Sequence, residues 1–374
     1  MNKVLLGDVA VEHKETCKGS KDGYPIVGLE HLIPEEITLT AWDEGSENTF
    51  SKMFRKGNVL FGRRRAYLKK AAVAPFDGIC SGDITVIEAK PDRILPELLP
   101  FIIQNDDLFD FAVGKSAGSL SPRVKWEHLK NYEFKLPDME KQKELAELLW
   151  AMDNTKKSYQ KLIAATDELV KSQFIEIFGN PNTNCKYPVT ELGSISDMIS
   201  GGTPSSKYPE YFGGDIPFMS TPSLGPNYID ATAAQNWLTE EGVNNSATHR
   251  IPAYALLFGN RVGVGKSSIN TCEVCTNQDI LSFVNIDPDR FDLLFVKKVL
   301  DQYQEFFDSQ KRGATIKGIP SDIVKASKIP VAPLSIQHAF VDFVRQSDKS
   351  KFELEKALSE LTATYKRIIA ENLG

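Results

Sequence analysis

The chain has 374 residues, of which 41% are hydrophobic and 25% are charged, and its formal net charge at pH 7 is −6. This length exceeds what one ordinary hydrophobic core supports, so it predicts two or three domains. No apolar run approaches the roughly 18 residues that a membrane span needs, and the N-terminus lacks the basic stretch and apolar core of a signal peptide, so we expect a cytoplasmic protein without a membrane partner.

The first predicted domain spans residues 1–135 and mixes short strands with one helix. β-Rich runs at residues 58–61 and 84–87 are bounded by turn residues and therefore predict strands. A helix is predicted over residues 95–109, where Pro96 suits the first helical turn. Short strands and a helix in one segment predict an α/β or α+β domain.

A central spacer follows at residues 136–178 and is predicted to be helical. Its apolar positions step by three or four residues, which is the spacing of a helix-packing seam, and Lys156 interrupts the seam. The predicted packing residues are Leu145, Leu149, Met152 and Tyr159. The absence of Pro and Gly over about 35 residues predicts a helix about 55 Å long.

The second predicted domain, residues 179–332, repeats the first. The Leu-Phe-Gly sequence at 60–62 returns at 257–259, and the Asp-Ile pair at 83–84 returns at 279–280, a lag of about 196 residues. About ten additional residues fall near the start of the second copy. Strands are predicted at residues 255–258 and 280–284, and a helix at 291–307.

A second helical spacer is predicted at residues 333–374. Its heptad seam consists of Leu354, Leu358, Leu361, Tyr365 and Ile368. A lone surface helix of this length is unusual, so the two spacers are expected to form a coiled coil. The short connection between residues 178 and 189 predicts that they run antiparallel, with one domain near each end. The alternative, in which each helix lies on its own domain, stays open.

The candidate DNA-binding residues of the first domain follow its first predicted strand. They are Arg63, Arg64, Arg65, Lys69 and Lys70. Guanidinium groups suit phosphate contact and bidentate recognition of guanine, although an isolated basic run is more often a solvated turn. The negative net charge counts against DNA binding. Residues 1–135 nevertheless hold 19 basic and 20 acidic groups, so a local basic face remains possible.

The candidates of the second domain are polar residues in loops. They are Thr203, Ser205, Lys207, Arg261, Lys266, Asn277 and Gln278. Small hydroxyl groups in the glycine-rich loop 201–207 can approach a phosphate closely. The amide side chains at 277–278 could recognise adenine, or they could simply form a turn before the next strand.

Patterns that would predict an active site or a metal site are incomplete. Asn260 breaks the phosphate-binding pattern that ends in Gly265-Lys266-Ser267. The Gly-x-Ser-x-Gly match at residues 114–118 follows a predicted helix, whereas a nucleophile elbow must follow a strand. The Cys-x-x-Cys pair at 272–275 has no second pair, and the five histidines show no metal-ligand spacing. We therefore predict a chain without catalytic residues or a metal.

Several motifs are shared with a known family. They include the Gly-Gly-Thr-Pro-Ser loop at 201–205 followed by residues 211–217, and the Arg-Ala-Tyr-Leu-x-Lys stretch at 65–70. The segment 313–319 and a proline followed shortly by glutamine at the start of each spacer add to the match. With these motifs, the whole chain resembles the specificity subunit of type I restriction-modification systems.

The resemblance implies a fold and a function. Two target recognition domains would each bind one half of a bipartite site on double-stranded DNA. The antiparallel helices would set the spacing between the halves and dock two methyltransferase subunits, and restriction subunits would join this core. S-adenosylmethionine, ATP and magnesium would belong to those partners, so we expect a non-catalytic subunit that holds no cofactor itself.

The first copy departs from the family pattern in one place. It has Lys-Gly-Ser-Lys at residues 18–21 where the second copy has its Gly-Gly-Thr-Pro loop. The two domains are therefore expected to recognise different sequences. Two alternatives stay open: a coiled-coil adaptor that does not read DNA, which the acidic balance suggests, and an autonomous enzyme, for which no catalytic pattern is found.

Overall fold

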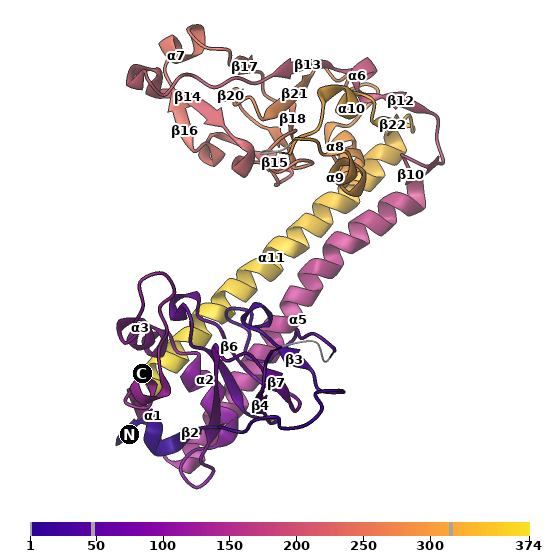
Figure 1. Ribbon diagram of the computed structural model, residues 1–374. Coiled ribbons are helices and arrows are strands. Elements are labelled where there is room, and N and C mark those ends of the chain that lie inside the picture. The colour runs from indigo at the N-terminus through magenta and orange to yellow at the C-terminus, as the bar shows by residue number, and fades with distance from the viewer. Residues whose placement is uncertain (1, 46–48, 314–316) are drawn as a thin grey trace. The chain divides into compact units, whose positions relative to one another are not determined.

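The computed structural model describes residues 2–45, 49–313 and 317–374. Part of the family-like segment 313–319 therefore lies outside the described residues. The chain divides into two compact units (Figure 1): unit 1 contains Met1–Leu162 with Glu353–Gly374, and unit 2 contains Ile163–Phe352. Across the described ranges, no helix is long and apolar enough to cross a membrane.

Unit 1 is built on an antiparallel sheet with the strand order β2-β8-β5-β6. These strands are β2 (Ala10–Glu12), β5 (Val59–Gly62), β6 (Ala71–Val73) and β8 (Ile84–Ala89). A smaller sheet contains β3 (Ile26–Val27), β7 (Gly78–Cys80) and β4 (Lys52–Phe54), and a separate pair contains β1 (Asn2–Leu5) and β9 (Glu133–Leu136). The helical segments are α1 (Leu6–Val9), η1 (Leu29–His31), η2 (Ala66–Leu68), η3 (Pro96–Leu98), α2 (Leu99–Ile103), α3 (Asp106–Gly114) and α4 (Trp126–Leu129).

Strand β5 is buried on both faces, which explains its continuous apolar sequence. Successive side chains of a strand point to opposite faces of the sheet. Val59 and Phe61 accordingly join the core cluster that contains helices α2 and α3. Leu60 joins the other cluster, with Val86 and Val27. Strand β5 thus packs against the helices on one face and against the smaller sheet on the other.

The predicted helix over 95–109 is wrong as a single element, because the chain forms η3, α2 and α3 there. The break lies at Asn105, whose backbone is extended and whose side chain accepts a hydrogen bond from the Asp107 N–H at 3.2 Å. This is an N-cap, so a new helix begins immediately after it. The predicted helix over 291–307 is also interrupted, at Gln302 and Tyr303, but there no side chain caps the following helix α9.

Unit 2 has the corresponding main sheet, with the order β13-β21-β18-β19-β15. Its strands are β13 (Asp197–Ser200), β15 (Tyr228–Ile229), β18 (Leu256–Gly259), β19 (Ser267–Asn270) and β21 (Ile280–Val284). The second sheet contains β14 (Phe212–Met219), β16 (Asn236–Leu238), β17 (Arg250–Ile251) and β20 (Val274–Thr276), and two further pairs are β10 (Gly179–Asn180) with β11 (Asn184–Cys185) and β12 (Val189–Glu191) with β22 (Lys328–Pro330). The helical segments are α6 (Leu192–Ile195), η4 (Pro209–Tyr211), η5 (Thr221–Ser223), η6 (Ala231–Ala233), α7 (Glu240–Asn244), α8 (Leu293–Asp301), α9 (Gln304–Gln310) and α10 (Ser321–Lys325).

The sequence repeat is therefore a repeat of fold. Strands β2, β8, β5 and β6 of unit 1 correspond in order and pairing to β13, β21, β18 and β19 of unit 2. Within the smaller sheets, β3 runs parallel to β7 as β14 runs parallel to β20. Unit 2 adds β15, β16 and α7, all of which follow β13. The additional elements thus lie in the early part of the second copy, where the sequence predicts additional residues.

Two helices of 40 residues each, α5 (Met139–Phe178) and α11 (Leu334–Leu373), follow the two domains (Figure 1). In unit 1, early residues of α5, including Leu145 and Leu149, share a core cluster with Ile369 and Leu373 near the end of α11. In unit 2, Phe174 and Phe178 near the end of α5 pack with the early α11 residues Phe340, Val341 and Val344. The helices are therefore packed together and antiparallel, as predicted.

The helix ends are also buried against the domains, and the far end of each helix packs on the other domain and not on its own. Tyr365 and Ile368 pack on the domain core of unit 1. The predicted seam residues Tyr159, Leu354, Leu358 and Leu361 are only half-buried, and Met152 is buried. Each helix thus packs on the other helix and, at its two ends, on the two domain cores.

Candidate nucleic-acid interface

Both units bring the same two segments together at one end of the main sheet. In unit 2, the loop that follows β13 meets the turn that leads into β21. In unit 1, the loop that follows β2 meets the equivalent turn at residues 81–83, and both line an open cavity of about 580 Å³. Loops carried on a rigid sheet are a common location for binding residues. The equivalent position in the two units makes this end of each sheet the candidate interface.

Close backbone contact explains the two glycines of the unit 2 loop. The Gly201 N–H donates to the Ile280 carbonyl at 3.1 Å, and the Gly202 N–H donates to the Thr276 carbonyl at 3.0 Å. A Cβ atom on Gly201 would lie 2.0 Å from the Asn277 carbonyl oxygen, and one on Gly202 would lie 2.3 Å from the backbone of Ala247. Only glycine allows the loop to lie this close to the turn.

Two of the predicted site residues meet across this contact. The Thr203 hydroxyl donates a hydrogen bond to Oε1 of Gln278, and both residues are exposed. Asn277 is used differently, because its Oδ1 accepts a hydrogen bond from the Asp279 N–H at 3.2 Å and so stabilises the turn. Gln278 therefore presents its amide to solvent, while Asn277 shapes the backbone beneath it.

Exposed residues continue along the unit 2 loop. Ser205 and Lys207 are both exposed, and the Lys207 N–H donates to the Ser205 hydroxyl oxygen at 3.4 Å. The Tyr208 and Tyr211 rings follow, with their centroids 5.0 Å apart. The rim in unit 2 thus consists of a hydroxyl, an amide, an ammonium group and aromatic rings, which suits contact with phosphate and base edges.

The two basic candidates of the segment 261–266 separate from each other. Arg261 lies toward the turn, with its Nη1 3.8 Å from Oδ1 of Asp279. Lys266 instead lines an open cavity of about 650 Å³ whose other lining residues include Lys297, Asp301 and Lys351. Only Arg261 therefore joins the loop and turn of the candidate interface.

In unit 1 the arginines of the basic run surround an aspartate. The Arg63 N–H donates to the Asp83 carbonyl at 3.0 Å, and Nη1 of Arg64 lies 3.5 Å from Oδ2 of Asp83. The third residue, Arg65, is exposed and has a left-handed backbone with φ of 55°. Among these three, the Arg65 guanidinium is the most available to a ligand.

The other two basic candidates are engaged within the unit. The Lys69 ammonium is 2.5 Å from Oδ1 of Asp106, in the first turn of α3. The Lys70 ammonium donates to the Leu29 carbonyl at 2.7 Å. These two lysines bind the basic run to neighbouring segments of unit 1. They are therefore not free in solvent, as they would be in a simple solvated turn.

Arg123 belongs to this site although its sequence context gave no indication of it. Its Nε and Nη2 donate to the two carboxylate oxygens of Asp83 at 2.7 and 3.2 Å. The Arg123 guanidinium lowers the pKa of Asp83 through these hydrogen bonds. The repeat gave no signal for it either, because Arg261, which lies beside the equivalent Asp279, corresponds to Arg64.

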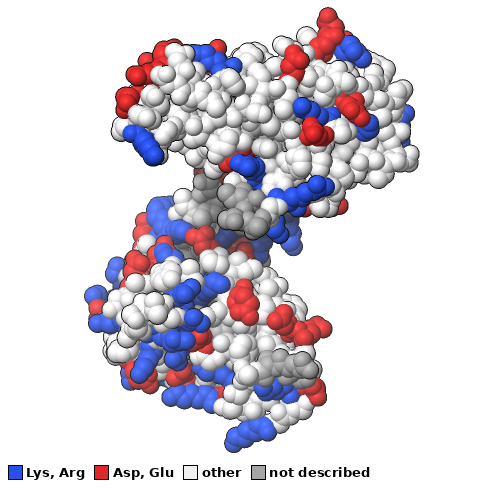
Figure 2. All heavy atoms as spheres, turned by 45° about the horizontal axis from the view of Figure 1, so that its top comes forward, with Lys and Arg blue, Asp and Glu red and all other residues white. Residues whose placement is uncertain are grey.

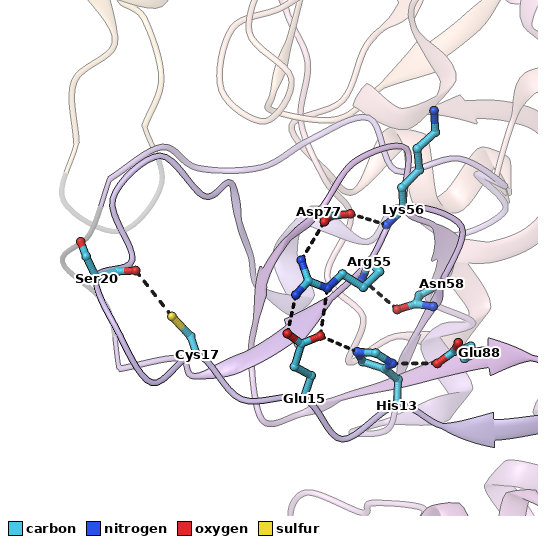
Figure 3. A network of polar contacts seen from close by, with 9 residues as sticks. All are labelled: His13, Glu15, Cys17, Ser20, Arg55, Lys56, Asn58, Asp77 and Glu88. Carbon is cyan, nitrogen blue, oxygen red and sulfur yellow. Dashed lines mark hydrogen bonds and ion pairs between the residues drawn. The ribbon is translucent and has the colours of Figure 1, made fainter.

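A second polar network borders the unit 1 cavity (Figure 3). Arg55 bonds Glu15 and also donates from Nη1 to Asp77 at 2.8 Å. His13 bridges Glu15 and Glu88, at 3.1 and 2.7 Å. Hydrogen bonding to Arg55 lowers the pKa of Glu15, so the carboxylate stays ionised. These contacts hold the loop after β2 in place and were not predicted from sequence.

One group of residues in unit 1 has the composition of a metal site, namely Glu30, His31 and Asp43. Nδ1 of His31 accepts a hydrogen bond from the Gly28 N–H at 2.9 Å, so the neutral ring carries its proton on Nε2. That Nε2 faces Oδ1 of Asp43 at 3.5 Å. Because the nitrogen that faces the carboxylates carries a proton, this group fits an ordinary hydrogen-bonded histidine and not a cation ligand.

Charged side chains are distributed differently over the two units. In the view of Figure 2, Lys and Arg gather over unit 1, whereas unit 2 presents a mainly uncharged surface. The candidate rims follow the same difference. Unit 1 surrounds its cavity with charged groups that are paired with one another, whereas the contact between loop and turn in unit 2 is made by the neutral Thr203 and Gln278.

Comparison with known proteins gives one consistent result. The family described as "Type I restriction modification DNA specificity domain" matches residues 3–165 and 185–362. A Methanocaldococcus jannaschii protein assigned as the specificity subunit of the type I restriction enzyme MjaX is 21% identical, over 92% of this chain and 87% of that protein. The Haemophilus influenzae HindI specificity subunit is 24% identical over 45% of this chain and 38% of its own length.

Solved structures share the fold. A chain from a type I restriction-modification system aligns with a TM-score of 0.63 and 19% identity, covering 99% of this chain and 97% of that chain. The S subunit of a type I system from M. genitalium aligns with a TM-score of 0.56 and 13% identity, covering 98% and 94%. The arrangement of two repeated domains and two long helices therefore recurs in these proteins.

Proposed function

The chain belongs to the type I restriction modification DNA specificity family, as a specificity subunit, and on this premise we propose that each of its domains reads one half of a bipartite DNA site. Specificity subunits are non-catalytic components of type I systems. The proposed partner is double-stranded DNA, bound within a complex that works in the cytoplasm. The alternative of a coiled-coil adaptor that does not read DNA receives no support from the comparisons.

The observation that carries this proposal is the equivalent loop-and-turn position in the two units. Both rims lie at the same end of equivalent sheets, but they present different side chains. Arg65 is the exposed arginine of the unit 1 basic run, and Gln278 is the exposed amide of unit 2. Arginine pairs with guanine and glutamine pairs with adenine through bidentate hydrogen bonds. Two domains with the same fold but different exposed side chains suit an asymmetric DNA site with two different halves.

The helices α5 and α11 are the proposed docking surface for two methyltransferase subunits. They expose large apolar side chains to solvent: Leu148 is 45%, Leu169 is 53% and Phe352 is 62% exposed. Exposed apolar groups of this size on helices that are otherwise charged mark protein interaction surfaces. The same helices would set the spacing between the half-sites. Restriction subunits would join this complex, and S-adenosylmethionine, ATP and magnesium would be bound by the partners.

The decisive experiment is single-base mapping of DNA methylation in cells that carry the chain with its modification subunits. We expect a motif of two defined halves separated by an undefined gap. Arg65→Gln should relax the base preference of one half, and Gln278→Ala that of the other. Arg93→Gln, which changes an exposed arginine at the opposite end of β8, serves as the control.

A single contiguous motif would contradict the bipartite proposal. If the Arg65 and Gln278 variants kept the wild-type motif and the wild-type methylation level, the assignment of the rims would be wrong. If the complex assembled and methylated DNA with no sequence preference, the chain would act as an adaptor.

A further inference from the structure

A buried glutamine stands near the start of each long helix, and the two occupy equivalent positions. Gln142 in α5 is 2% exposed and Gln337 in α11 is 0% exposed. Both lie in the first turns of their helices. A polar side chain with so little exposure must find hydrogen-bond partners inside the protein.

Gln142 connects its helix to the domain that precedes it. Its Oε1 accepts a hydrogen bond from the Leu95 N–H at 2.8 Å, and its Nε2 donates to the Pro137 carbonyl at 2.9 Å. Leu95 is the N-cap residue of η3 and has no side-chain cap of its own. The amide of the long helix therefore binds an otherwise unpaired N–H group at the start of a domain helix.

Gln337 repeats this arrangement in unit 2. Its Oε1 accepts from the Asp292 N–H at 2.9 Å, and its Nε2 donates to the carbonyls of Arg290 and Ala332 at 2.9 and 2.8 Å. Asp292 is the N-cap residue of α8. Each glutamine thus fastens the long helix to the N-cap residue of a domain helix and to the backbone immediately before the long helix.

Aromatic contacts also join each domain to the long helices, and in unit 1 one of them is accompanied by a directional bond, because the Trp150 Nε1 donates to the Glu97 carbonyl at 3.0 Å. In unit 1 the Phe101 ring of α2 lies 5.1 Å from the Trp150 ring of α5. In unit 2 the Phe295 ring of α8 lies 4.8 Å from the Phe178 ring. Packed rings tolerate a small rotation of one helix on another, whereas hydrogen bonds to fixed backbone groups weaken steeply when their angles change. The glutamines therefore supply buried, directional bonds between domain and helix at equivalent positions in both units.

We propose that Gln142 and Gln337 are positioning residues that hold each recognition domain at one angle on the long helices, and that this angle restricts the protein to one spacer length between half-sites. The inference rests on the proposed function, because it assigns a role within the recognition of a bipartite site. One base pair added to the spacer moves the second half-site by about 3.4 Å and rotates it by about 35°. Domains held at fixed angles cannot follow that change, whereas loosened domains can.

The test uses the full chain assembled with its modification subunits and the DNA motif found by methylation mapping. Duplexes carry the two half-sites with the natural spacer or with one or two base pairs added or removed, and the initial rate of methylation is measured. The variants are Gln142→Met and Gln337→Met, which keep the side-chain length but remove the hydrogen bonds. Gln160→Met and Gln346→Met change exposed glutamines on the same two helices and serve as matched controls.

We expect the wild type and the controls to methylate a duplex with a one-base-pair change at least about tenfold more slowly than the natural spacer. In Gln142→Met and Gln337→Met the ratio should fall to about threefold or less, while base substitutions in either half-site keep their wild-type penalty. Thermal unfolding of each variant accompanies the rates. If Gln337→Met does not fold, Gln142→Met carries the test, because Gln142 makes two hydrogen bonds where Gln337 makes three.

The possible outcomes separate the two levels of the proposal. An unchanged ratio in folded glutamine variants would overturn their positioning role and leave the bipartite site intact. An equal loss of rate on all spacers, together with a lower midpoint of thermal unfolding, would also overturn it, because the glutamines would then contribute only to stability. A wild type that is indifferent to spacer length would likewise overturn the positioning role, whereas a single contiguous motif in the methylation mapping would overturn the proposed function itself.

Discussion

Unit 1 and unit 2 share the same sheet and helix arrangement, but they differ in the side chains of the loop and turn at one end of the main sheet, which form the rim of each candidate interface. The main sheets have equivalent strands, and each long helix begins at a buried glutamine. At the rim, unit 1 has Asp83 clasped by Arg123, whereas unit 2 has Thr203 bonded to Gln278. Buried groups are constrained by packing and hydrogen bonding, whereas exposed loop residues are free to vary. The comparison therefore separates what the fold requires from what recognition can change.

The largest expected effect tests whether the unit 2 rim depends on close backbone contact. In Gly202→Ala the new Cβ would lie 2.3 Å from the Ala247 backbone, so the loop must move away. We expect a loss of stability of about 2 kcal/mol and the loss of base preference in one half-site only. Thermal unfolding and methylation of half-site variants measure the two effects.

Gly19→Ala is the matched control in the corresponding loop of unit 1. A Cβ at Gly19 meets nothing within 4 Å, and the backbone there is not left-handed. This variant should keep wild-type stability and specificity. If Gly202→Ala and Gly19→Ala had the same stability and base preference, the close backbone contact of Gly202 would not be a difference between the two candidate interfaces.

The next prediction concerns the ion pair that replaces this contact in unit 1. Because Arg123 lowers the folded-state pKa of Asp83, the pair stabilises the fold above the unfolded pKa of about 3.9, and this contribution is lost as the pH falls through the folded value. Asp83→Asn should therefore cost about 1 kcal/mol at pH 7, a modest value since the Arg123 side chain is 41% exposed.

Urea unfolding at pH 7 and at pH values below 4 measures this effect. The difference between Asp83→Asn and the wild type should shrink as the solution becomes acidic. Asp92→Asn, which changes an aspartate that is 76% exposed, should show no such dependence. A constant difference across the pH range would mean that Asp83 stabilises unit 1 by some means other than its charge.

A smaller effect is expected at Lys207, in the exposed loop of unit 2. If its ammonium group contacts a phosphate, Lys207→Gln should weaken DNA binding evenly over all sequences and reduce the slope of log affinity against log salt by about 1. Binding titrations at several salt concentrations measure the slope. Lys328→Gln, on β22, is the control and should leave it unchanged. A change in base preference would instead make Lys207 a base-reading residue.

The smallest expected effect is none at all. Cys272 and Cys275 are free thiols, and Cys275 is buried, which raises the pKa of its thiol. Neither a reducing agent nor a metal chelator should change the midpoint of thermal unfolding. A decrease with the chelator would reveal a bound metal and would reopen the interpretation of this Cys-x-x-Cys pair.

The sequence predicted the repeated fold better than the sites on it. Strand β21 coincides with its predicted bounds of residues 280–284, because a run that is apolar except at Ser282 is buried on both faces. The helix over 95–109 was wrong because the capping bond at Asn105 is a local effect that hydrophobic spacing does not detect. Local sequence thus located the four strands that it predicted and both long helices, but it did not show where the two domain helices break.

Contacts between distant residues explain why the candidate site was predicted only in part. Clustered basic residues identified the run that begins at Arg63, but the bond between the Lys70 ammonium and the Leu29 carbonyl joins residues far apart in the sequence. The bond between Arg123 and Asp83 also joins residues far apart in the sequence. The repeat placed Asp83 and Asp279 at equivalent positions, but it did not indicate either of these contacts.

The paired strands at the base of each domain have a topological consequence. In unit 1, β1 pairs with β9 so that Asn2 lies opposite Leu136, and in unit 2, β12 pairs with β22 so that Val189 lies opposite Pro330. Each domain is therefore a closed loop of chain whose first and last strands pair with each other, and this pair of strands is the neck of the domain. Residues inserted inside the loop change what the domain contains without moving the neck. A domain can thus change in size without changing the helix that follows it. Both helices have 40 residues although the second domain is larger.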